Sequence, residues 1–136
     1  MKAKMIITSA LIVLLASCAP GANAPIEDQM MAYNWKIIYA KHLNQDVTPI
    51  FIPYTFDFQG NNVVTATKAD STFTGSWVRS NTSQSQPKVL MNFGTHYELS
   101  MLNYDWQQEE RTDNIIKFVD EMSAQSTEAV TFEKIP

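Results

Sequence analysis

The sequence predicts an all-β protein whose domain is a single eight-stranded antiparallel up-and-down barrel. Short segments alternate apolar and polar residues with the two-residue period of a half-buried strand, and turn-forming residues separate these segments. No ten-residue helical pattern lies between consecutive segments, which disfavours a parallel sheet of βαβ units. The same spacing fits a sandwich of two sheets, and we favour the barrel.

The expected elements begin after residue 25. Residues 26–33 carry acidic side chains at their start, where they suit a helix dipole, and are compatible with a short helix. The period changes to that of a strand at Asn34. One face of this strand is expected to carry Trp35, Ile37 and Tyr39, and the other Lys36, Ile38 and Ala40. Further strands are expected over residues 54–58, 63–67, 72–79, 88–93, 106–110, 115–119 and 129–134.

Turn-forming residues connect these strands. Gly60 and the asparagines after it tolerate positive φ and suit a hairpin turn. Gly75 lies between two aromatic residues of one strand face, where it suits a bend or a close approach. Residues 80–87 form a polar loop, and the longer connection 94–105 has room for a helical turn at 97–102.

The first 18 residues have the pattern of a targeting signal rather than of a barrel strand. Two lysines precede an apolar run, residues 5–16, which has the length of a signal-peptide core and is too short to span a bilayer. The run ends in Leu15-Ala16-Ser17-Cys18, which resembles the lipobox of bacterial lipoproteins, where cleavage before the cysteine is followed by its acylation. An ordinary signal peptide that happens to end in Cys is the alternative.

These features divide the chain into a signal peptide (1–17), a lipidated N-terminus and tether (18–33) and a barrel domain (34–136). The lipobox resemblance implies that Cys18 is the lipidation site, and two or more acyl chains there would make membrane attachment effectively permanent. Residues 19–25 are small and contain two prolines, as in a flexible spacer. Ala19, where some lipoproteins carry a retention aspartate, favours the outer membrane, and the lack of an acidic run after Cys18 favours a periplasm-facing position over the cell surface.

Composition limits the partners of the domain. The 136-residue chain holds one cysteine, so the domain after Cys18 cannot form an internal disulfide and depends on its core. The whole chain is 45% hydrophobic and 11% aromatic, which is ample for a packed core. Loss of Lys2 and Lys4 with the signal peptide moves the net charge from −4 to −6. A mildly acidic domain without a basic cluster gives no electrostatic reason to bind nucleic acid.

A series of short motifs in a fixed order covers residues 35–134. They are Trp35-Lys36-Ile37, Tyr54-Thr55-Phe56-Asp57-Phe58, Thr74-Gly75-Ser76-Trp77, Asn92-Phe93-Gly94, Leu102-Asn103-Tyr104-Asp105-Trp106 and Val130-Thr131-Phe132-Glu133-Lys134. Together they resemble the lipocalin-like lipoproteins of Bacteroidetes bacteria. The resemblance implies an eight-stranded lipocalin-like barrel, in a group most of whose members have no assigned function.

One motif departs from that of ligand-carrying lipocalins. Those proteins open with Gly-x-Trp, whereas this chain has Tyr33-Asn34-Trp35 at the corresponding place. The resemblance to them is therefore one of fold, which does not by itself give a function. Trp35 is expected to close one end of the barrel by packing.

The sequence offers no catalytic signature, and we expect neither an enzyme nor a cofactor. His96 and Glu98 lie two residues apart, as two metal ligands on a strand would, but two histidines in a domain without cysteine make a zinc site improbable. No Gly-x-Ser-x-Gly element is present. Four acidic residues lie close together along the chain, where solvated strand and turn positions explain them better than a glycosidase pair does. These residues are Asp105, Glu109, Glu110 and Asp113.

Aromatic residues on two strands expected to be neighbours are the candidate ligand-binding residues. They are Tyr54, Phe56, Phe58, Phe73 and Trp77. They would line the barrel interior, either as an apolar pocket for a small hydrophobic molecule or as a filled core. The first case predicts an anchored ligand-binding lipoprotein. The second predicts a non-enzymatic interaction module of the cell envelope, an inhibitor or assembly factor that contacts another protein through residues 80–87 and 94–105.

Overall fold

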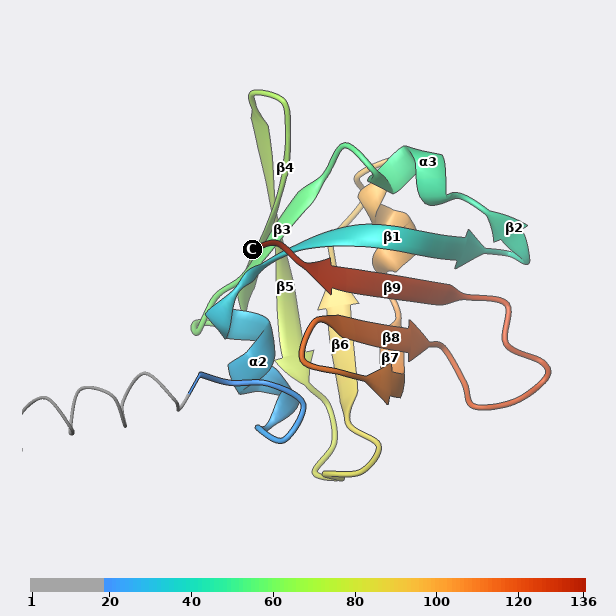
Figure 1. Ribbon diagram of the computed structural model, residues 1–136. Helices are drawn as coiled ribbons and strands as arrows, with labels where there is room; N and C mark the ends of the chain where they lie inside the picture. Colours follow the sequence, from blue (N-terminus) through green and yellow to red (C-terminus); the bar gives the residue numbers. More distant parts are fainter. Residues whose placement is uncertain (1–18) are drawn as a thin grey trace, which may run out of the picture.

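Eight antiparallel strands close into a barrel in the computed structural model of the protein, which describes residues 19–136 (Figure 1). The strands are β1 (Asn34–His42), β3 (Thr55–Phe58), β4 (Val63–Lys68), β5 (Ser71–Arg79), β6 (Lys88–Asn92), β7 (Asp105–Arg111), β8 (Ile115–Val119) and β9 (Ala129–Lys134). Each strand pairs with the next, and β9 pairs with β1 to close the ring. The predicted all-β up-and-down barrel is confirmed. The predicted signal peptide and Cys18 lie outside the described residues.

Three short helices and one short strand complete the described chain. The strand β2 (Gln45–Asp46) pairs with β1 outside the ring, and the helix α3 (Thr48–Phe51) follows it; the sequence predicted neither. The 3₁₀ helix η1 (Leu99–Leu102) lies within the expected helical turn. The helix α2 (Ile26–Ala32) matches the expected short helix. None of the described helices is long and apolar enough to cross a membrane.

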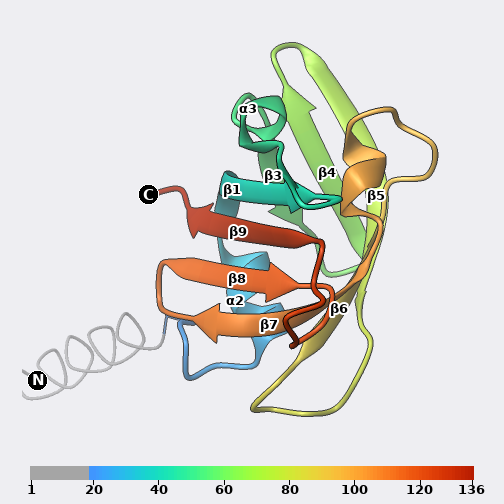
Figure 2. The same cartoon turned by 90° about the vertical axis from the view of Figure 1, so that its right-hand side faces the viewer.

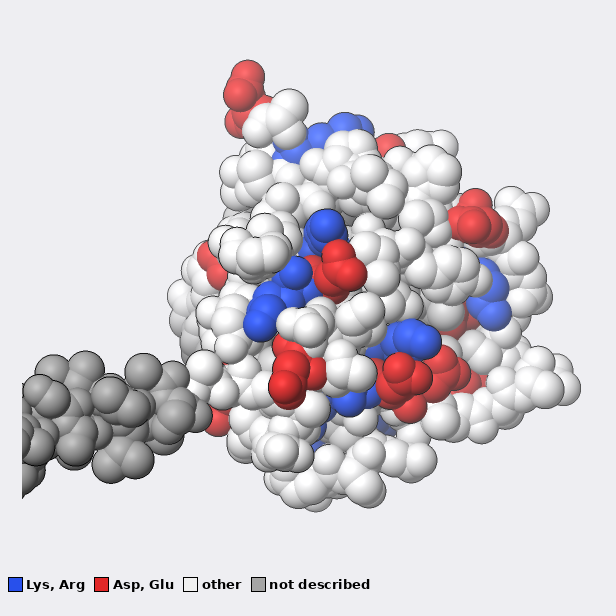
Figure 3. All heavy atoms as spheres, in the orientation of Figure 1, with Lys and Arg blue, Asp and Glu red and all other residues white. Residues whose placement is uncertain are grey.

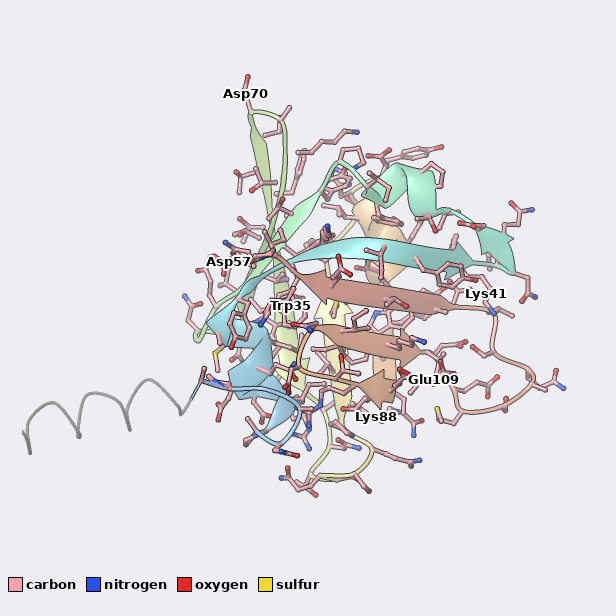
Figure 4. The ribbon with its side chains drawn as sticks, in the orientation of Figure 1. Trp35, Lys41, Asp57, Asp70, Lys88 and Glu109 are labelled. Carbon is pink, nitrogen blue, oxygen red and sulfur yellow. The ribbon has the colours of Figure 1, made fainter. Side chains whose placement is uncertain are left out.

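The helix α2 lies at the end of the barrel where β1 begins and β9 ends (Figures 1 and 2). Its residues Ile26, Gln29 and Met30 are at most 1% exposed. Trp35, at the start of β1, is fully buried and donates its indole N–H to the carbonyl oxygen of Met30 at 2.9 Å (Figure 4). Trp35 thus packs at this end, as expected, and α2 is an integral part of the fold.

The two ends of the barrel differ in their connections. The end that holds α2, here called the α2 end, also carries the short turns 59–62 and 112–114 and the polar loop 80–87. The opposite end, here called the loop end, carries the connections 43–54, 69–70, 93–104 and 120–128. In Figure 1 the β1–β2 hairpin and the β8–β9 connection extend to the right, away from α2.

A β-bulge in β1 corrects the face assignment made from alternation. The register against β9 shifts between Ile37 and Tyr39. An extra residue in one strand turns all later side chains to the opposite face. Tyr39 is therefore 40% exposed, although the alternation placed it with Trp35, and Ala40 is buried at 2%.

The segment before α2 is held against the barrel, which differs from the flexible spacer that its composition indicates. The Tyr33 hydroxyl donates to the carbonyl oxygen of Pro20 at 2.8 Å, and the Ala22 amide donates to Asp113 Oδ1 at 2.8 Å. Small and proline residues allow flexibility, but these tertiary hydrogen bonds fix the chain from Pro20 onward. Local sequence could not show the second of these bonds, because Asp113 lies 91 residues from Ala22 along the chain.

Candidate functional site

The predicted ligand-binding residues meet inside the barrel. Tyr54, Phe56 and Phe58 are at most 2% exposed, Trp77 is 5% exposed, and Phe73 is partly buried. The ring centroids of Phe58 and Trp77 are 5.5 Å apart, and those of Tyr54 and Phe73 are 6.4 Å apart. These are the separations of aromatic side chains in direct contact.

The strands that carry these rings are separated by β4, so the expectation that they are neighbours is wrong. Phe58 pairs with Val64 of β4, which pairs in turn with Gly75 of β5. Ala66 occupies the same intermediate place between Phe56 and Phe73. Because the inward residues of β4 are smaller than those rings, the side chains of β3 and β5 can meet across it.

Phe132 of β9 joins the cluster from the other side of the barrel, and the sequence reasoning missed it as a site residue. Its ring lies 5.4 Å from Phe56, 5.8 Å from Phe58 and 6.2 Å from Phe118. Its inward position in an alternating strand was the signal that could have found it. Aromatic side chains from β3, β5, β8 and β9 thus fill the interior between them.

The polar atoms of the cluster are bonded within the protein. The Tyr54 hydroxyl donates to Glu98 Oε1 at 2.6 Å, and the Trp77 indole N–H donates to the carbonyl oxygen of Gln59 at 3.0 Å. Burial of the Tyr54 side chain, and then its bond to Glu98, raise the pKa of the phenol well above its usual range. These bonds orient the two rings and use the hydrogen of each group within the protein.

Three hollows of the described residues are lined mostly by residues outside this cluster. One of about 650 Å³ borders residues 19–24, and one of about 290 Å³ lies on the outer face of β1, β9 and β8. A third, of about 230 Å³, is lined by α2, the 59–62 turn and residues 77–79 of β5. Tyr54, Phe56, Phe58 and Phe73 line none of the three.

The histidine and glutamate weighed as metal ligands are engaged in separate structural bonds. His96 Nδ1 accepts the backbone N–H groups of Glu98 and Leu99 at 3.2 and 3.0 Å, next to the start of η1. Glu98 accepts from Tyr54 and from Lys68 Nζ at 3.3 Å, and the Tyr54 bond lowers the pKa of the Glu98 carboxyl. Within residues 19–136, no three His, Cys, Asp or Glu side chains gather where they could hold a metal ion.

A second histidine–glutamate pair, which the sequence did not indicate, lies at the loop end. Glu128 is 1% exposed and its carboxylate bonds His42 Nδ1 at 2.5 Å and accepts the Leu43 amide at 2.8 Å. The Asn44 amide donates to the carbonyl oxygen of Thr127 at 3.0 Å. These bonds fix the 120–128 connection to the turn after β1.

The four acidic residues named from the sequence are dispersed among separate contacts. Asp105 pairs with Lys88 at 3.2 Å, and Glu110 lies 3.7 Å from Lys117. Asp113 accepts the Ala22 amide, and Glu109 is exposed at a register shift between β7 and β8. On the face shown in Figure 3, acidic and basic side chains are intermixed.

The four most exposed large apolar side chains of the described residues all belong to connections at the loop end. Leu43, Ile52, Tyr97 and Met122 are 66%, 58%, 87% and 47% exposed. They belong to three different connections, 43–54, 93–104 and 120–128, all of which leave the barrel at the same end (Figures 1 and 2). Single exposed apolar residues are ordinary, but several at one end of a small domain mark a candidate interaction surface. We call these four residues the apolar rim.

Comparison of the chain with family models, with curated proteins and with solved structures finds no match in any of the three.

Proposed function

We propose that this protein is a lipid-anchored, non-enzymatic interaction module of the bacterial cell envelope that binds another envelope protein through its loop end. The observation that carries the proposal is the filled interior together with the apolar rim. Buried rings of β3, β5, β8 and β9 contact one another in the interior, where an internal ligand would have to lie. The rim instead leaves apolar surface in contact with solvent.

The anchor in this proposal is Cys18, carried by the lipobox of a lipocalin-like lipoprotein. The sequence supports an outer-membrane position facing the periplasm, since Ala19 and not an acidic residue follows the cysteine. Replacing Cys18→Ser is expected to release the protein from the membrane fraction or to block its processing. Unchanged membrane partition of this variant would remove the anchor from the proposal.

Photo-crosslinking in intact cells of the native host tests the partner. A photoreactive phenylalanine analogue replaces Tyr97 at the apolar rim or, as the matched control, Gln84 in the exposed polar loop at the α2 end. We expect one discrete protein adduct from position 97, and at least about tenfold less of it when Leu43 and Ile52 are both changed to Ser, since burial of each such side chain contributes about 1.5–3 kcal/mol.

Equal adducts from positions 97 and 84, or an adduct that persists without the two apolar residues, would contradict the use of the rim. Binding of a small hydrophobic molecule inside the barrel is the competing function. It predicts a bound lipid in native mass spectra of the host protein and uptake of a fluorescent fatty-acid analogue. Either result would favour a ligand carrier over the interaction module.

A further inference from the structure

The chain just after the predicted lipidation site is fixed to the α2 end of the barrel over a run of residues. Pro20 accepts the Tyr33 hydroxyl at 2.8 Å, and the Ala22 amide donates to Asp113 Oδ1 at 2.8 Å. Lys134 Nζ lies 4.4 Å from the centroid of the Tyr33 ring. Figure 1 shows this segment passing beside α2 before the helix begins. The first residue after Cys18 that the barrel holds is therefore Pro20.

Arg111, the last residue of β7, also binds the segment before α2. Its Nη1 donates to the carbonyl oxygens of Ala24 at 2.8 Å and Gly21 at 3.4 Å, and to Gln29 Oε1 at 3.0 Å. Gln29 is fully buried and donates through Nε2 to the carbonyl oxygen of Thr112 at 2.8 Å. A guanidinium is suited to such multiple contacts because its donors are rigidly arranged. The segment before α2, the helix α2 and the β7–β8 turn are thus joined by hydrogen bonds into one unit.

The length of free chain between anchor and barrel is therefore very small. Two residue steps separate Cys18 from Pro20, and a fully extended chain spans about 3.6 Å per step, which gives about 7 Å. The polar layer of one bilayer leaflet is itself about 5–8 Å thick. An acyl group on Cys18 inserted into the leaflet would leave no room for a gap between the headgroups and the α2 end.

We propose that the α2 end of the barrel rests on the phospholipid headgroup layer, which holds the loop end and its apolar rim away from the membrane. This proposal rests on the lipidation of Cys18 in the proposed function. The α2 end is then the membrane-facing surface of the domain, whereas the anchor alone would leave the orientation of the domain undefined.

The chemistry of this surface fits headgroups rather than acyl chains. Asn23, Asp28 and Asp113 are exposed there, and with Lys134 and the Tyr33 ring they border a hollow of about 650 Å³. Carboxylates beside a lysine match the amine and the phosphate of a zwitterionic headgroup. They do not form the basic cluster that would select anionic lipid. The expected partner is therefore a phosphatidylethanolamine-rich leaflet.

Fluorescence quenching in vesicles tests the orientation on the full lipidated chain. Because the domain has no cysteine of its own and acylation occupies Cys18, one engineered thiol is labelled selectively. Asn61→Cys marks the α2 end and Ala124→Cys the loop end, both at exposed positions. The vesicles contain phosphatidylcholine, phosphatidylethanolamine and a headgroup-attached quencher. We expect at least about threefold stronger quenching at position 61, since a nine-residue strand separates the ends by about 20–30 Å.

Two changes test the cause of the orientation. A 20-residue Gly-Ser insert after Cys18 has an r.m.s. span of about 25 Å and is expected to abolish the difference between the two labels. Arg111→Ala is expected to reduce the difference, whereas Lys117→Ala, the same charge change on the outer face of β8, leaves it unchanged. Should Arg111→Ala not fold, Asp113→Ala removes the bond to Ala22 instead.

The outcomes separate this proposal from the one it rests on. A chain recovered without acyl chains by mass spectrometry would overturn the anchor and the orientation together. An acylated chain on vesicles that gives equal quenching at positions 61 and 124 would overturn the orientation alone. A difference that survives the Gly-Ser insert would overturn the short link as its cause.

Discussion

Tyr54 and Glu98 show how one partly buried hydrogen bond makes stability depend on pH. The bond lowers the folded-state pKa of the Glu98 carboxyl below its ordinary 4.5. A carboxyl with a lowered folded pKa stabilises the fold above its unfolded pKa and loses this contribution as the pH falls through the folded pKa. The raised pKa of Tyr54 stabilises the fold below pH 10, and this contribution is lost as the pH rises further.

Tyr54→Phe removes the shared hydrogen bond and keeps the ring. We expect a loss of about 1–2 kcal/mol in the free energy of unfolding at pH 7, because the carboxylate loses its donor. The loss should shrink at acidic pH, measured here at pH 3, since protonation of Glu98 removes the carboxylate that needs the donor. Urea unfolding of both proteins at the two pH values measures this, and a loss that grows at pH 3 would contradict the assignment.

Gly75 occupies a position where no side chain fits. A Cβ there would lie 2.7 Å from the backbone oxygen of Asn92 and 2.7 Å from Phe93 Cδ1, so the close approach indicated by the sequence is confirmed. Gly75→Ala is expected to cost about 1–3 kcal/mol, as overpacking does. Gly60→Ala is the control, since its Cβ would meet only Met31 Sδ at 3.6 Å. Equal midpoints of denaturant unfolding for the two variants would refute this explanation.

At the scale of elements, two adjacent methionines of α2 differ in burial and so test how much the helix contributes to stability. Met30 is 1% exposed and Met31 is 38% exposed. Met30→Ala is expected to destabilise the fold by about 2–5 kcal/mol through the cavity it leaves, and Met31→Ala by less than about 0.5 kcal/mol. Thermal unfolding of the two variants decides this. Similar small effects would mean that α2 is only an attachment to the barrel.

The sequence located the eight barrel strands well because each has a regular period and a turn on either side. It missed β2 and α3, since two and four residues are too few to show a period. The bulge in β1 was also missed, because an unpaired extra residue appears only against the partner strand. The two-residue period therefore predicts faces correctly up to Ile38 and incorrectly from Tyr39 onward.

The sequence predicted that the candidate ligand-binding residues lie inside the barrel. It did not predict whether they leave space there for a ligand. That question depends on the register of three strands and on the small inward residues of β4, which no single segment shows. The partners that fix residues 20–24 are equally remote, since Arg111 and Asp113 lie about ninety residues downstream. Long-range pairing, rather than local propensity, decided both points.

At the scale of the whole molecule, the filled interior predicts that the barrel binds a small apolar molecule only after a large side chain is removed from it. Phe132→Ala removes the ring that contacts Phe56, Phe58 and Phe118. We expect a loss of about 3–5 kcal/mol and a cavity that admits a benzene-sized molecule. Calorimetry or ligand-observed NMR with benzene should then detect binding to the variant and none to the parent protein. Binding by the parent would indicate an open lumen.

The pairing of β1 with β9 leaves no open sheet edge in the described barrel, which matters where many copies of the protein lie close together. Molecules anchored in one leaflet, as proposed for this chain, meet their own copies at high local concentration in two dimensions. An open sheet would then present unpaired edge groups on which neighbouring copies could add strands and aggregate. In the described ring each barrel strand has a partner on both sides, and the strand outside it, β2, has only two residues. The topology thus protects densely packed copies from pairing edge to edge.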